Sequence, residues 1–91
     1  MATLNTNIFS DNFRNLSNFP EIIQLIESSP TLTRQLNQLP IESIGKSGTN
    51  ETSATGKNIV IGDDVIANGP GEIAIALAHE VAHAVLEGGI A

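Results

Sequence analysis

The sequence predicts a single α+β domain, with short helices near the amino end, a small sheet or hairpin in the middle and a long helix at the carboxyl end. Three observations support this prediction. Apolar residues recur at helical spacing in residues 20–39, β-branched residues gather in residues 58–62, and an apolar run fills residues 70–87. A chain of 91 residues is long enough for one small domain.

The composition excludes several classes of function. The formal charge is −6, and the four cations are scattered along the chain, so we expect neither nucleic acid nor an anionic membrane as partner. The absence of cysteine excludes disulfides, thiolate zinc sites and cysteine nucleophiles. No apolar run reaches the length of a membrane span, and residues 1–10 lack the features of a Sec signal. We therefore expect a cytoplasmic location or export by a specialised secretion system.

The first half of the chain is expected to act as scaffold. Residues 1–19 are rich in Asn, Ser and Thr, which predicts a polar arm in front of a single domain at residues 20–91. Within residues 20–39, Pro20 and Pro30 are each placed to begin a short helix, because proline suits the first helical turn.

The middle of the chain is expected to form a loop and a strand. Gly, Ser, Thr and Asn dominate residues 45–57, which predicts a flexible loop that follows a short strand at residues 41–44. The β-branched residues at 58–62 then predict the clearest strand.

The segment at 70–87 predicts a long helix that begins near Pro70 and ends before Gly88. Glu72 suits the positive end of the helix dipole. Because the helix is apolar almost all round, we expect it to be buried.

This helix carries the motif His79-Glu80-Val81-Ala82-His83. Residues four apart on a helix differ in direction by about 40°, so His79 and His83 project from one face and suit two corners of a tetrahedral zinc site. Glu80 lies about 100° from His79, where its carboxylate can hold and deprotonate a water on the metal. A single buried histidine is usually a structural residue. Burial of all three polar side chains without a metal would cost several kcal/mol.

The strand, the glycine-containing loop and the ALAHEVAHAV helix together resemble the zincin metallopeptidases over residues 57–88. The resemblance implies that His79 and His83 bind Zn²⁺, that Glu80 is the catalytic base, and that a peptide or protein is the substrate. It also implies that the strand at 58–62 is the edge strand along which the substrate lies. Among zincins, the short amino-terminal helices, the long loop and the motif are most similar to bacterial effector and toxin-type domains.

The third zinc ligand is not evident from the sequence. Metzincins would require glycine and histidine where this chain has Leu86 and Gly89, so that subclass is excluded. Gluzincins take the ligand from a second helix further downstream, so we expect it in a carboxyl-terminal segment that follows residue 91. Glu87 is a weaker candidate, since it also suits an exposed position in the last turn or a hydrogen bond to His83.

Three other carboxylates remain as candidate ligands, each with a structural explanation. Asp63 and Asp64 at a strand end are typical of a turn, and Glu72 is explained by the helix dipole.

The alternative function is a non-catalytic or incomplete module with this motif that acts in protein–protein interaction. On so small an apolar body, we expect a homo-oligomer or association with the carboxyl-terminal segment.

Overall fold

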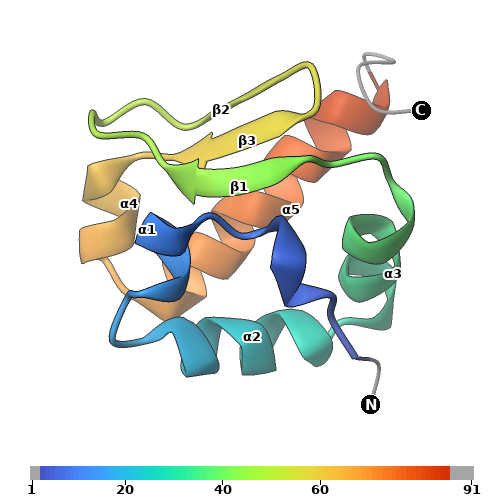
Figure 1. Ribbon diagram of the computed structural model, residues 1–91, viewed down its shortest axis with the longest axis horizontal. Helices are drawn as coiled ribbons and strands as arrows, with labels where there is room; N and C mark the ends of the chain where they lie inside the picture. The colour runs from blue at the N-terminus through green and yellow to red at the C-terminus, as the bar shows by residue number, and fades with distance from the viewer. Residues whose placement is uncertain (1–2, 87–91) are drawn as a thin grey trace.

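The computed structural model describes residues 3–86 and confirms the α+β class. Figure 1 shows the sheet at the top of the view, with the shorter helices below it and the longest helix crossing behind it. Among the described residues, no helix is long and apolar enough to cross a membrane. In chain order the elements are η1 (Thr6–Ile8), α1 (Asp11–Arg14), α2 (Phe19–Glu27), α3 (Pro30–Gln38), β1 (Ser43–Lys46), β2 (Ser53–Thr55), β3 (Asn58–Ile61), α4 (Asp63–Ala67) and α5 (Pro70–Leu86).

The sheet has the strand order β1-β3-β2. β3 pairs with β1 in parallel, with Ile44 opposite Ile59, and with β2 in antiparallel fashion, with Ala54 opposite the same Ile59. The strand expected at 58–62 is present and ends at Ile61, but its expected position at the edge of the sheet is wrong. β3 is central because backbone groups on both of its sides are paired, and β2 forms the edge.

The segment at 45–57 contains strand residues, so the expectation that all of it forms a loop is wrong. It contains the end of β1, all of β2, and a two-residue turn whose first residue, Gly56, has a φ of +60°. A positive φ at that position is typical of a tight hairpin turn and favours glycine. A polar side chain of this segment also binds backbone outside it: the Thr52 hydroxyl accepts a hydrogen bond of 2.7 Å from the Gly62 N–H.

The amino-terminal segment belongs to the core, which corrects the expectation of a polar arm at 1–19 and of a domain that begins at 20. Phe9 is 1% exposed and forms a parallel bridge with Ile44, so it covers the outer edge of β1. Phe13 is also buried, and its ring centroid lies 5.3 Å from that of Phe9. The backbone N–H of Ser10 donates to the Ile44 carbonyl at 2.9 Å.

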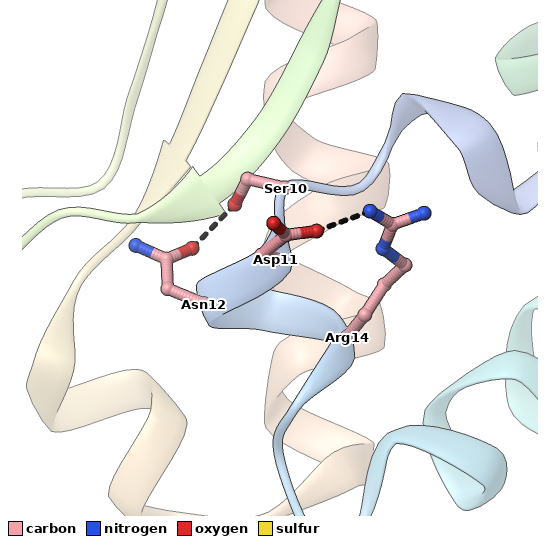
Figure 2. A network of polar contacts seen from close by, with 4 residues as sticks. All are labelled: Ser10, Asp11, Asn12 and Arg14. Atoms are coloured by element: carbon pink, nitrogen blue, oxygen red, sulfur yellow. Dashed lines mark hydrogen bonds and ion pairs between the residues drawn. The ribbon is translucent and has the colours of Figure 1, made fainter.

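Two polar contacts lie within α1 and its N-cap, next to β1 (Figure 2). The Ser10 hydroxyl donates to the amide oxygen of Asn12, and Arg14 forms an ion pair with Asp11 one turn earlier. Asp11 and Arg14 are exposed, so the aromatic burial of Phe9 and Phe13 contributes more to stability than this surface ion pair.

Two helices fill the segment 20–39, where two short helices were expected. Proline occupies the first turn of both α2 and α3, and the Ser29 hydroxyl accepts a hydrogen bond of 3.2 Å from the Leu32 N–H at the start of α3. The two helices are linked by a buried bond of 2.8 Å from the Thr33 hydroxyl to the Ile26 carbonyl.

The long helix α5 lies between the sheet and α2, as Figure 1 shows. Its buried apolar residues are spaced at three or four positions and face β2, β3 and α2: Ile73, Leu77, Val81 and Ala84. The expectation of a helix buried all round is wrong, because Ile75 is 64% exposed and Leu86 is 85% exposed on other sides. The packing of one face therefore turns the opposite face outward.

Candidate functional site

His79 and His83 lie on the exposed face of α5, one helical turn apart. Their Nε2 atoms are 2.9 Å from each other, and the ring centroids are 4.4 Å apart with an angle of 76° between the ring planes. The expectation that both rings point the same way is confirmed. Their expected burial is wrong, since only Glu80 of the three polar side chains of the motif is buried.

The spacing of the two imidazoles suits a shared metal ion. A zinc ion bound about 2.0–2.1 Å from each of two nitrogens at the tetrahedral angle holds those nitrogens about 3.3–3.4 Å apart. The observed 2.9 Å is therefore about 0.4–0.5 Å shorter, a difference that small side-chain rotations can remove. The two nitrogens are of the atom type that zinc binds, and at 2.9 Å they are also within hydrogen-bond distance of each other.

Glu80 lies at the boundary between the buried and exposed faces of α5. Its side chain is 8% exposed, and no group within residues 3–86 donates a hydrogen bond to its carboxylate. Within residues 3–86 no fully buried side-chain oxygen lacks a hydrogen-bond partner, so the Glu80 carboxylate keeps contact with solvent while the rest of the side chain is covered. Such a carboxylate is suited to accept a proton or a hydrogen bond from a bound molecule.

A cleft of about 250 Å³ opens next to the motif. Both His79 and Glu80 contribute to its wall, so the proposed base faces a space that a ligand can enter. The remaining lining residues come from the loop before β2, from α4 and from the first half of α5: Thr52, Val65, Glu72, Ile75 and Ala76.

The loop before β2 reaches the cleft because it passes close to Gly62, the residue between β3 and α4. A Cβ atom on Gly62 would lie 2.6 Å from the Asn50 carbonyl oxygen, so only glycine allows this approach. The bond from the Gly62 N–H to the Thr52 hydroxyl then fixes the loop, and the open edge of β2 follows directly after it.

No third metal ligand joins the two histidines within residues 3–86, where no group of three or more His, Asp or Glu side chains is placed to hold a metal. Asp63 accepts a hydrogen bond from Gly48, and Asp64 accepts one from Val65, so both serve the start of α4. They do not form the expected turn but begin a helix.

The other two candidate ligands have different outcomes. Glu72 shares the cleft with His79 but belongs to no metal-binding group with both histidines. Glu87 lies outside the described residues, as does the expected cap at Gly88.

Sequence reasoning missed the contribution of Thr52 and Val65 to the cleft. Val65 comes shortly after a strand and Thr52 lies in a polar stretch, and neither position indicates a binding site in the sequence. The glycine that begins the hairpin turn, Gly56, is the signal that indicates a strand just before it, and hence the position of Thr52.

Comparison with known proteins adds no relative, because neither a protein-family model, nor a curated protein, nor a solved structure matches this chain.

Proposed function

We propose that this chain carries the zinc-binding helix of a metallopeptidase that hydrolyses peptide bonds. The observation that carries the proposal is the convergence of two imidazole nitrogens beside a buried carboxylate without a described hydrogen-bond donor, at the wall of a cleft. A structural histidine pair would not by itself explain why the adjacent glutamate lies at the wall of the cleft.

In this proposal His79 and His83 hold the metal through Nε2. When bound, zinc supplies Lewis-acid chemistry, because it polarises a carbonyl oxygen and lowers the pKa of a coordinated water to about 7. The Glu80 carboxylate accepts a proton from the attacking water and delivers it to the leaving amine, which is the usual division of labour for a general base.

The substrate is proposed to lie along β2. Among residues 3–86 nothing pairs with the outer edge of this strand, and α5 packs against it. The opposite edge of the sheet, at β1, is covered by the bridge from Phe9 to Ile44. An extended peptide can add to the open edge through backbone hydrogen bonds, and antiparallel addition continues the pairing that β2 already makes with β3.

We assign the remaining metal positions to water and to a protein group outside residues 3–86, because no third ligand is present among those residues. Glu87, a further carboxyl-terminal segment and a second copy of the chain remain candidates for that group.

Two substitutions test the proposal. Glu80→Gln should retain zinc and lose turnover of a peptide substrate by at least about 1,000-fold, since the amide cannot accept the proton. His79→Ala should lose zinc, because one imidazole alone binds weakly. Zinc per chain is measured by metal analysis after purification without a metal-affinity tag, and turnover is measured with quenched fluorogenic peptides.

Glu21→Gln is the matched control, because Glu21 is an exposed glutamate on α2, away from the cleft. It should leave both zinc content and turnover unchanged. Undiminished turnover in Glu80→Gln would refute the role of Glu80 and the hydrolase with it.

The second candidate is a non-catalytic interaction module. The exposed apolar side chains of α5, chiefly Ile75 and Leu86, favour it, since such side chains are typical of surfaces that bind another protein. In that case zinc stays far below one per chain, and added zinc does not raise it.

A further inference from the structure

The cleft combines an apolar wall with two carboxylates: Glu80 beside the histidines, and Glu72 about two helical turns before His79 on the same side of α5. The apolar surface comes from Val65, Ile75 and Ala76. At about 250 Å³ the cleft is smaller than the sites that enclose drug-sized ligands, so it suits a single side chain.

The Glu72 carboxylate has no ion-pair partner within residues 3–86. Arg14 pairs with Asp11, and no lysine or arginine contributes to the lining of the cleft. The chain as a whole carries a charge of −6, so a cationic ligand is also attracted over longer distances.

We propose that this cleft takes the lysine or arginine side chain of a peptide substrate, with Glu72 as the residue that selects the positive charge. The methylene groups would lie against Val65, Ile75 and Ala76, while the charged end pairs with the Glu72 carboxylate at the rim. The inference rests on the proposed peptidase function and adds the class of peptide that the site selects.

The direction of the edge strand places the basic residue relative to the cleaved bond. Thr52, in the wall of the cleft, comes just before β2 and so lies at the amino end of that strand. A peptide antiparallel to β2 brings its carboxyl-terminal part to this end. In Figure 1 α5 runs in the same general direction as β2, so its metal-binding part is proposed to lie further along β2 than the cleft. On this proposal the basic residue is the one that follows the cleaved bond.

Binding to the zinc-supplemented Glu80→Gln protein tests the selection without cleavage. Two fluorescently labelled peptides are used, identical except for lysine or norleucine after the bond that would be cleaved, and affinity is measured by fluorescence anisotropy. The lysine peptide should bind about fivefold more tightly at low salt, and the preference should shrink at high salt because the charges are partly exposed.

Substitution of Glu72 assigns the preference to one carboxylate. Glu72→Gln in the same background should bring the affinity ratio close to one, and Glu72→Lys should favour a peptide with glutamate at the variable position. Glu21→Gln is the matched control, since Glu21 is likewise an exposed glutamate in the first turn of a helix that has a proline in that turn. It removes a similar interaction with a helix dipole and should leave the ratio at about fivefold.

Each outcome decides between the two proposals. A lysine preference that survives in Glu72→Gln, or equal affinity of the two peptides, overturns the role of Glu72. A lysine preference without cleavage by the wild-type protein supports the basic-residue site and overturns the peptidase. Cleavage of both peptides at equal rates supports the peptidase and overturns the basic-residue site, and binding of neither peptide overturns the selection. If Glu72→Lys does not fold, as judged by circular dichroism, the wild-type and Glu72→Gln ratios still decide the question.

Discussion

Both faces of α5 carry large aliphatic side chains, but one face is buried and the other is exposed to solvent. One face presents Ile73, Leu77 and Val81 to the sheet and α2, while the other leaves Ile75 and Leu86 in solvent. The comparison teaches that apolar content alone does not mark the inward face of a helix. The two histidines lie on the exposed face. Glu80 lies at the boundary between the faces, where it is buried like the inward residues and ionisable like the histidines.

The largest expected difference between the faces appears when the same substitution is made on each. Leu77→Ala should lower the free energy of unfolding by about 2–5 kcal/mol, because it leaves a cavity in the core. Leu86→Ala removes the same atoms from a residue that is 85% exposed and should change it by less than about 0.5 kcal/mol. Urea denaturation followed by circular dichroism measures both, and equal losses would contradict the division into two faces.

A metal should stabilise the protein through the outward face. With free zinc at about 100 times its dissociation constant, the free energy of unfolding should rise by about 2.7 kcal/mol in the wild-type protein. His83→Ala should abolish most of that gain while leaving the stability in a chelator similar to that of the wild type, because the His83 side chain is exposed. Thermal denaturation with and without zinc measures the effect, and an equal gain in both proteins would place the metal elsewhere.

At Glu80, on the boundary between the two faces of α5, the side chain that serves the proposed function is expected to lower the stability of the protein. In a chelator, Glu80→Met should raise the free energy of unfolding by about 1–2 kcal/mol, since an apolar side chain replaces a buried carboxylate without a described donor. Chemical denaturation measures this gain, and Glu21→Met, at an exposed position, serves as the control. A loss of stability in Glu80→Met would mean that the carboxylate is well solvated in the folded protein.

The elements with strong local signals could be predicted from the sequence. Pro20, Pro30 and Pro70 lie in the first turns of three helices, because a proline there sacrifices no helical hydrogen bond. The two histidines converge because their spacing matches one turn of the helix, which is a local property that tertiary packing does not alter.

The parts that failed depend on contacts between distant segments. β2 consists of Ser53, Ala54 and Thr55, whose pairing rests on backbone hydrogen bonds to β3 rather than on apolar side chains. The burial of Phe9 depends on Ile44, which no periodicity within residues 1–19 can indicate. The cleft likewise depends on the fold, since Thr52 and Glu72 are far apart in the sequence and line the same cleft only in the folded chain.

The bridge between Phe9 and Ile44 also has a consequence for synthesis of the protein. A ribosome adds about 5–20 residues per second, so Phe9 must wait roughly 2–7 s after its own translation before its partner exists. During that interval the three phenylalanines near the amino end have no strand to cover, and the nascent chain presents them to whatever surrounds it.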